Sequence, residues 1–387
     1  MTTMAIDNKD KKVLNVPHLR FPEFSGEWKK HSLGEIGETI IGLTYKPSDV
    51  VDNNGIIVFR SSNIKNGMID YSDLVRVNKH IKDKIITKEN DILVCARNGS
   101  QRLIGKNAII KQEDANNTFG AFMMVYRAND NPFILPLLST KKYFSQVGEN
   151  LGARINQITT SDFNGFEFYF PENHAERTKI AELFRLLDER IATQNKIIED
   201  LKKLKSAISE RLFNAIKGDV VVLEDIGDVV KGKQINGEFL SESGKYYVMN
   251  GGIEPSGFYN DYNVEANTIS ISEGGNSCGY VQFNACPFWS GGHCYTIQNT
   301  TDNVKTEYLY QFLKSKESEI MKLRIGSGLP NIQKKDLAKF KITIPNISEQ
   351  KVISAFLSSF ERKADVEMNF VNLLLEEKQY LLRQMFI

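Results

Sequence analysis

The chain has 387 residues, of which 41% are hydrophobic and 25% charged, which excludes a disordered or fibrous protein. Its net charge of +1 and pI near 7.6 provide no overall basic field of the kind that identifies many nucleic-acid-binding proteins. The opening stretch MTTMAIDNKDKK lacks a signal-peptide core, and no window reaches the roughly 18 apolar residues of a membrane span, so we expect a cytoplasmic protein.

The chain contains an internal repeat. LGEIGETIIGLTYK at Leu33 matches LEDIGDVVKGKQI at Leu223, and NQITTSDFNGFEFYFP at Asn156 matches NIQKKDLAKFKITIP at Asn331. The ends of the two halves match, whereas the middles differ in sequence and the second middle is shorter. We therefore interpret the matched ends as a common scaffold and the middles as variable regions. We predict five parts: an N-terminal segment (1–32), a first domain (33–172), a first long helix (173–218), a second domain (219–346) and a second long helix (347–387).

The two middles are predicted to be short strands separated by turns. GIIVF, DILVCA, KNAII and FMMVYRA occur in the first half, and KYYVMNGG, NTISIS, GYVQF and CYTI occur in the second. These β-branched and aromatic runs are broken by Gly and Asn. We therefore expect an α+β fold with two mixed, mainly β domains and a few helices, such as one over 306–323.

The four cysteines are Cys95, Cys278, Cys286 and Cys294, and we expect reduced thiols. Cys278, Cys286, His293 and Cys294 fall within one segment, which leaves zinc as an alternative. Neither gap between these cysteines has the short spacing that structural zinc sites favour. Burial of small residues in strands is the better interpretation, and we predict no metal site.

Two segments, from about Glu176 to Ala215 and from about Ser348 to Phe386, carry heptad repeats that predict coiled-coil helices. At about 1.5 Å per residue, the 36 residues from Ile180 to Ala215 would be roughly 54 Å long. We expect the two helices to pair antiparallel and to hold the domains at a set distance. The predicted seam consists of Phe184, Leu187, Ile191, Gln194, Ile198, Leu201, Lys205 and Ile208 in the first helix, and Leu357, Phe360, Glu367, Val371, Leu374, Lys378 and Leu381 in the second.

The seam has polar breaks at the same steps of both helices, which suggests a register. One antiparallel register places Gln194 opposite Lys378 and Lys205 opposite Glu367 at the same time. Buried polar positions fix register in coiled coils, so we state this pairing as a hypothesis. Packing of each helix on its own domain is the alternative.

The sequence resembles the specificity subunits of type I DNA restriction-modification enzymes. The resemblance rests on the opening VPHLRFPEFSGEWKKHSLGEIG and on the motifs AERTKIAELFRLLDERI and SEQKVISAFLSSFERKADV, which are similar to EQxKIAxxLxxLDxxI. Arg177 departs from the usual Gln, and Glu361 from the usual Asp. The resemblance implies a non-catalytic pseudo-two-fold protein in which each variable domain recognises half of a split DNA site and the helices set the spacer.

The resemblance also implies the partners. Two modification subunits, which are adenine methyltransferases, would dock on the helices, and restriction subunits would complete an ATP-dependent endonuclease. S-adenosylmethionine, ATP and Mg are expected on those partners, with no cofactor on this chain. GSQRLIGKN at Gly99 does not fit a phosphate-binding loop, and DNPF at Asp130 is better explained by a Pro-containing turn than by a methyltransferase motif. We therefore predict no catalytic residue.

Candidate DNA contacts are the amide, hydroxyl and basic side chains on loops at equivalent points of the two repeats. Asn156 and Asn331, which both repeats share, are interpreted as structural caps. Arg97 and Arg102 are the strongest candidates, because guanidinium groups beside Gly suit a base edge or a phosphate. The full set is Lys46, Arg60, Ser62, Asn63, Lys65, Arg97, Asn98, Ser100, Gln101, Arg102, Arg154 and Gln157 in the first half, and Lys233, Gln234, Asn250, Asn276, Ser277, His293, Ser327 and Gln333 in the second.

Charge differs between the two variable regions. Residues 33–155 contain 16 basic and 13 acidic side chains, a net charge of +3, whereas residues 223–328 contain 8 and 13, a net charge of −5. The acidic second region supports a different class of function, a coiled-coil adaptor whose two domains bind proteins. A self-sufficient nuclease or methyltransferase is disfavoured by the missing motifs. Recognition of double-stranded DNA remains the leading hypothesis.

Overall fold

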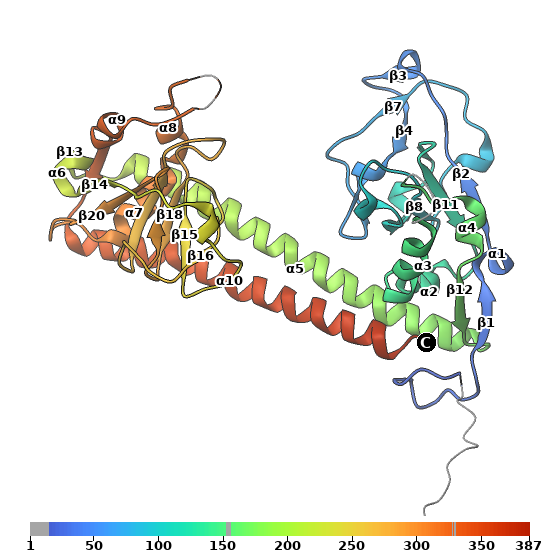
Figure 1. The fold of residues 1–387 in the computed structure, drawn as a ribbon. Helices are drawn as coiled ribbons and strands as arrows, with labels where there is room; N and C mark the ends of the chain where they lie inside the picture. The colour runs from blue at the N-terminus through green and yellow to red at the C-terminus, as the bar shows by residue number, and fades with distance from the viewer. Residues whose placement is uncertain (1–14, 152–155, 327, 329) are drawn as a thin grey trace, which may run out of the picture. The chain divides into compact units, whose positions relative to one another are not determined.

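The computed structural model describes residues 15–151, 156–326, 328 and 330–387, which form two compact units (Figure 1). Unit 1 comprises the chain up to Thr193 together with Val371–Ile387, and unit 2 comprises Gln194–Phe370. Two long helices contribute to both units: α5 spans His174–Ala215 and α10 spans Ile347–Gln384. The predicted fold class is confirmed, and both helices end within two residues of the predicted positions.

Unit 1 contains a four-stranded sheet of order β2-β11-β8-β9 and a second of order β10-β4-β7-β3. Strand β8 is buried along its whole length because alternate residues enter different cores. Ile92 and Val94 pack toward the helices, whereas Leu93 and Cys95 pack toward the second sheet. The elements of unit 1 before α5 are β1 (Lys29–Ser32), α1 (Leu33–Ile36), β2 (Glu38–Ile41), β3 (Val50–Val51), β4 (Ile56–Phe59), β5 (Ile64–Lys65), β6 (Met68–Ile69), β7 (Arg76–Val77), β8 (Ile92–Cys95), β9 (Asn107–Ile109), β10 (Thr118–Phe119), β11 (Met123–Arg127), α2 (Asn131–Leu137), α3 (Lys141–Leu151), α4 (Thr160–Asn164) and β12 (Glu167–Phe170).

Unit 2 repeats this arrangement with sheets of order β14-β20-β17-β18 and β16-β15-β19. The sheet face that is apolar in unit 1 is polar here, since Ser270, Ser272 and Thr296 are buried on it. The predicted helix over 306–323 is split in two at Lys316. The elements of unit 2 are β13 (Asp219–Val222), α6 (Leu223–Ile226), β14 (Asp228–Lys231), β15 (Tyr246–Met249), β16 (Phe258–Tyr259), β17 (Thr268–Ser272), β18 (Val281–Asn284), β19 (Trp289–Ser290), β20 (Cys294–Gln298), α7 (Thr306–Ser315), α8 (Glu317–Met321), α9 (Lys334–Ala338) and β21 (Lys341–Ile344).

The repeat extends to the parts where the two sequences diverge. Strands β2, β11, β8 and β9 correspond in order to β14, β20, β17 and β18, and the pair β1-β12 corresponds to β13-β21. The parallel pairing of β4 with β10 likewise corresponds to that of β15 with β19. The variable middles therefore share a strand order that their sequences do not reveal.

Helices α5 and α10 pair antiparallel in each unit, and their ends complete the two cores. In unit 1 the start of α5 contributes Ile180 and Phe184, the end of α10 contributes Leu382, and Phe386 follows two residues after that helix. In unit 2 the end of α5 contributes Phe213 and the start of α10 contributes Leu357. Every predicted seam residue is buried or half-buried. The apolar stripe thus faces a partner helix, as heptad spacing requires.

The predicted register is wrong. Gln194 donates a hydrogen bond to Glu367, Lys205 donates to Glu361 at 2.6 Å, and Lys378 pairs with Asp188. The seam lysines reach carboxylates beside the seam, at 188 and 361, where the ammonium groups keep partial access to water. Any antiparallel register satisfies the repeat symmetry, so the symmetry alone does not identify the observed one.

Cysteine cross-linking would test the observed register. In a Cys286→Ser background, Gln194→Cys combined with Glu367→Cys is expected to form a disulfide under mild oxidation, because these side chains meet within unit 2. The matched control, Lys205→Cys with Glu367→Cys, tests the pairing predicted from the sequence and is expected to stay reduced. Cross-linking of the control pair at the same rate would contradict the observed register. Gel mobility with and without reductant is the measurement.

The departure at Arg177 from the usual Gln is explained by its contacts. At the equivalent position of unit 2, Gln350 donates to the carbonyls of Pro345 and Asn303, both at 2.8 Å. Arg177 donates to the carbonyl of Pro171 at 2.6 Å, and its Nε lies 2.9 Å from Asp130. Both side chains therefore tie the start of a long helix to the preceding strand.

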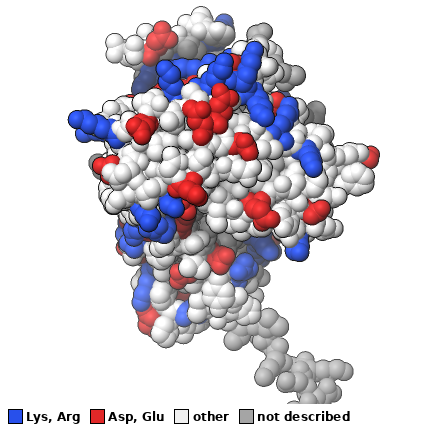
Figure 2. Space-filling view, turned by 90° about the vertical axis from the view of Figure 1, so that its left-hand side faces the viewer, with Lys and Arg blue, Asp and Glu red and all other residues white. Residues whose placement is uncertain are grey.

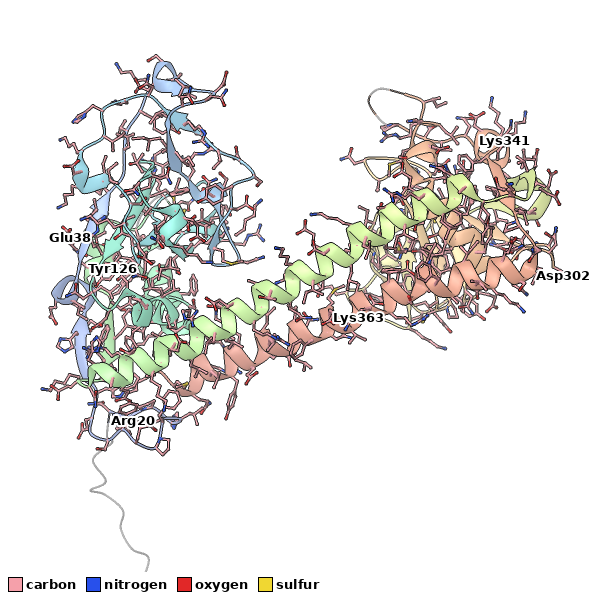
Figure 3. The ribbon with its side chains drawn as sticks, turned by 180° about the vertical axis from the view of Figure 1, so that it is seen from behind. Arg20, Glu38, Tyr126, Asp302, Lys341 and Lys363 are labelled. Atoms are coloured by element: carbon pink, nitrogen blue, oxygen red, sulfur yellow. The ribbon has the colours of Figure 1, made fainter. Side chains whose placement is uncertain are left out.

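The first turn of α5 holds a buried ion pair. Glu176 is fully buried, and Arg20 contacts both of its carboxylate oxygens at 2.7 Å. Trp28 Nε1 donates to the same carboxylate at 3.3 Å. Figure 3 labels Arg20 at the side of the helix pair. The N-terminal segment is thereby fastened to unit 1, because a buried carboxylate is stable only when it is compensated.

Three other features of the sequence can be compared with the structure. Cys95, Cys278 and Cys294 are buried, Cys286 is exposed, and no cluster of metal-binding side chains is found in the described part of the chain. DNPF begins helix α2, with Pro near its first position, so the predicted simple turn is wrong. Across the described residues, no helix has the length and apolarity to cross a membrane.

Candidate nucleic-acid interface

The predicted DNA-contact loops of unit 1 gather at one edge of the sheet β2-β11-β8-β9. The strands are antiparallel, so the ends of β2 and β8 meet the start of β11. The backbone of Leu43 donates to Phe119 at 2.7 Å, and that of Arg97 donates to Phe122 at 3.0 Å. We call the residues 42–46, 60–63, 96–102, 120–122 and 156–157 loop cluster 1.

Loops carrying different candidates are joined by hydrogen bonds inside loop cluster 1. Asn98 Nδ2 donates to Ser61 Oγ at 2.9 Å, and its backbone donates to Asn156 at 3.3 Å. Asn156 has a φ of +37° and donates through Nδ2 to Gly99, which supports its interpretation as a structural residue. Three sequence-distant loops are therefore held as one surface.

Several candidates of unit 1 are occupied by structural contacts. Asn63 is fully buried, accepts from the backbone of Arg60 at 2.9 Å and donates to two backbone carbonyls, so its prediction as a DNA contact is wrong. Arg60 pairs with Asp73 at 2.7 Å, and Lys65 pairs with Asp70 at 3.0 Å. Hydrogen bonds from Ser72 and then Lys65 hold the pKa of Asp70 at about 2.

Other candidates of unit 1 remain available to a ligand. Arg97 and Arg102 are exposed, and neither has an ion-pair partner among the described residues. The guanidinium of Arg97 lies 5.2 Å from the ring centroid of Phe122, itself 60% exposed. Lys46, Ser62 and Gln101 are also exposed, whereas Asn98, Ser100 and Gln157 are half-buried. Arg154 lies outside the described residues.

The loops of unit 2 gather at the equivalent sheet edge. Lys233 donates through its backbone to Ser290 at 2.8 Å, Gly291 donates to Met249 at 2.8 Å, and Ile332 donates to Glu273 at 2.9 Å. We call the residues 232–234, 250–252, 273–277, 290–293 and 330–333 loop cluster 2. A Cβ on Gly232 would lie 2.1 Å from the Gly291 carbonyl, so this backbone crossing requires glycine.

The candidates of unit 2 also divide into residues occupied by structural contacts and residues available to a ligand. Ser277 donates to Gly251 at 2.7 Å, and Asn250 Oδ1 accepts from the backbone of His293 at 3.1 Å, so both are half-buried structural residues. The exposed candidates are Lys233, Gln234, Asn276, His293 and Gln333. Trp289 is half-buried and donates to the Lys233 carbonyl at 2.9 Å. Ser327 lies outside the described residues.

Loop cluster 2 contains a carboxylate that sequence reasoning missed. Glu273 Oε1 accepts from Lys231 at 2.6 Å and from the Tyr295 hydroxyl at 3.1 Å. Its Oε2 is buried, has no hydrogen-bond partner among the described groups and lies 3.6 Å from His293 Nδ1. Burial and then Glu273 raise the pKa of Tyr295 to about 12. The only available sequence signal was its position directly after a predicted strand.

Basic side chains are not spread evenly over the face that Figure 2 shows. Figure 2 shows Lys and Arg gathered along one edge of the visible face, with Asp and Glu scattered over the rest. Next to loop cluster 2, the exposed Lys334 and Lys335 lie in the first turn of α9 directly after Gln333. These two lysines were also missed as candidates. Contact with DNA phosphates requires basic groups near the contact, and these can be present even where the net charge of the whole region is negative.

Comparisons with known proteins agree on one family. A family model described as "Type I restriction modification DNA specificity domain" matches residues 25–203 and 217–374. A Mycoplasma pneumoniae protein provisionally named as a type I specificity subunit is 34% identical over 161 residues, 41% of this chain and 42% of its own length. The type I restriction enzyme MjaVIII specificity subunit of Methanocaldococcus jannaschii is 23% identical over 396 residues, 90% of this chain and 89% of its own.

A solved structure shares the fold. The crystal structure of the S subunit of a type I restriction-modification system from M. genitalium superposes with a TM-score of 0.63 at 20% identity, covering 96% of this chain and 99% of that one. The first relative is matched over less than half of its length, whereas this structural likeness spans both units.

Proposed function

The chain belongs to the family of type I restriction modification DNA specificity domains, and from this premise we propose that it reads DNA sequence for a type I restriction-modification complex. Each unit would recognise one half of a bipartite double-stranded target. The observation that carries the proposal is the equivalence of loop clusters 1 and 2. Each lies at the equivalent edge of the corresponding sheet in its own unit, and both present exposed amide or basic side chains, but their residues differ. Recognition of two different half-sites requires loops that are held in the same way in both units but that present different side chains to the bases.

The chemistry of the complex would be supplied by partners. Two modification subunits acting as adenine methyltransferases, together with restriction subunits, would bind S-adenosylmethionine, ATP and Mg. This chain would supply recognition and a scaffold, with α5 and α10 setting the separation of the half-sites. The adaptor alternative has no support in the family match.

Selection of bound duplexes tests the proposed function. The full chain with its co-purifying partners is expected to enrich a split motif from random duplexes. Its affinity is expected to fall steeply, by about a thousandfold or more between roughly 50 and 200 mM salt. Arg102→Ala is expected to weaken binding to all sequences alike, because an exposed guanidinium beside the sheet edge suits a phosphate. Equal binding to all duplexes would favour the adaptor, and methylation by the purified chain alone would favour an enzyme.

A further inference from the structure

The two loop clusters place different chemistry at one equivalent point. In unit 1, Phe122 directly precedes β11, and its carbonyl accepts from the backbones of Ala96 and Arg97, both at 3.0 Å. In unit 2, His293 directly precedes β20, and its carbonyl accepts from the backbone of Glu273 at 2.9 Å. The pairing of Glu38 with Arg127, and of its equivalent Asp228 with Gln298, fixes this correspondence.

We propose that this point holds the specificity-determining pair of each unit, with Arg97 and Phe122 in unit 1 and His293 and Glu273 in unit 2. The proposal rests on the proposed function and names the groups that distinguish the half-sites. Phe122 and His293, which occupy the equivalent position in the two units, both project into solvent: Phe122 is 60% exposed and the His293 side chain 63%. Both are anchored through their backbones to the end of a buried strand, so their positions are defined although their tips are free.

The pair in unit 1 fits an acceptor-rich base edge. Arg97 has no acidic partner in the described part of the chain, and the Phe122 ring lies 5.2 Å from its guanidinium. Stacking on the ring orients the guanidinium without consuming its donors. Guanidinium donors match O6 and N7 of guanine, and an aromatic edge matches the methyl group of thymine. We assign unit 1 a guanine next to a thymine.

The pair in unit 2 fits an amino group. The Glu273 carboxylate lies 3.6 Å from His293 Nδ1, so the tautomer that carries its proton on Nδ1 places an N–H beside that carboxylate. In this tautomer Nε2 is an acceptor, which suits the N4 amino group of cytosine or the N6 amino group of adenine. Glu273 acts as a positioning residue through His293. Lys231 and Tyr295 occupy its other oxygen and hold the carboxylate in place.

Sequencing of duplexes selected by the full chain with its co-purifying partners tests these assignments. Phe122→Ala and Arg97→Ala are each expected to reduce enrichment about tenfold at one base pair, or two adjacent ones, within one half-site. His293→Ala is expected to do the same within the other half-site. Glu273→Ala should relax the same position as His293→Ala, whereas Glu265→Ala, which removes an exposed carboxylate of unit 2 outside loop cluster 2, should leave the motif unchanged.

Phe144→Ala is the matched control, because Phe144 is an exposed aromatic residue of unit 1 on α3, outside loop cluster 1. Thermal unfolding of each variant verifies that the fold is retained. The inference is overturned if Phe122→Ala preserves the motif, lowers all sequences equally, or alters the half-site that His293→Ala alters. A wild-type chain that enriches no motif overturns the proposed function itself, which separates the two failures.

Discussion

Replacing Phe386 with alanine is expected to lower the free energy of unfolding of unit 1 by about 3–5 kcal/mol. Phe386 is only 8% exposed, and its ring centroid lies 5.7 Å from that of Phe184, 5.8 Å from Phe133 and 6.3 Å from Trp28. Truncation removes the buried ring and leaves a cavity between residues from distant parts of the chain. Both effects are destabilising, and the lost ring contacts, of which the one with Trp28 is edge-to-face, add to the loss.

The internal repeat supplies a matched control for this substitution. Phe213 is the equivalent residue, and its ring centroid lies 5.8 Å from Tyr308 and 5.3 Å from Phe312 in unit 2. Hydrogen exchange should show lost protection in β8 and β11 for Phe386→Ala, and in β17 and β20 for Phe213→Ala. Equal loss in both units from either substitution would contradict the division of the two cores.

Arg20→Ala is expected to destabilise unit 1 by about 3–5 kcal/mol, because it leaves the fully buried Glu176 carboxylate without its cation. The hydrogen bond from Trp28 at 3.3 Å is too little to offset that charge. Denaturant unfolding monitored by tryptophan fluorescence is suitable, since Trp28 lies 1% exposed at the same site.

Two further variants show whether the buried charge is responsible. Lys29→Ala removes an ion pair with Glu172 in which both side chains are 62% exposed, and should change stability by less than about 1 kcal/mol. Adding Glu176→Gln to Arg20→Ala should recover more than half of the loss, because a neutral amide is cheaper to bury. If the double variant is no more stable than Arg20→Ala, uncompensated charge is not the cause.

The sequence predicted the long helices well because heptad spacing is a local pattern read along one element. The register failed because it depends on which side chains meet across two elements. The lysines at 205 and 378 reach positions 361 and 188, which are not seam positions. Strand positions such as 92–95 were also predicted correctly, while the common strand order of the variable middles was hidden by their divergence.

For the candidate site, the sequence identified which loops gather but not which side chains are free. Residue type alone does not distinguish Asn63, which is used to hold its own loop, from the exposed Gln101. Phe122 was missed because it was assigned to the strand that it precedes, and Glu273 because the candidates comprised amide, hydroxyl and basic side chains. Their relevance arises from the neighbours Arg97 and His293, which only the three-dimensional arrangement supplies.

The division of the chain into units has a consequence for biosynthesis. Unit 2 is one continuous stretch, so a ribosome releases all of its residues before α10 is finished. The core of unit 1 includes Leu382, Met385 and Phe386, which are translated after all of unit 2. Unit 1 therefore cannot complete its core until these residues are made, and Trp28 and Phe184 stay incompletely covered until then. Unit 2 can complete its core earlier, although most of unit 1 precedes it in the sequence. The unit whose synthesis begins first is therefore the last to complete its hydrophobic core. We expect the nascent chain to be most prone to aggregation while the core of unit 1 is incomplete.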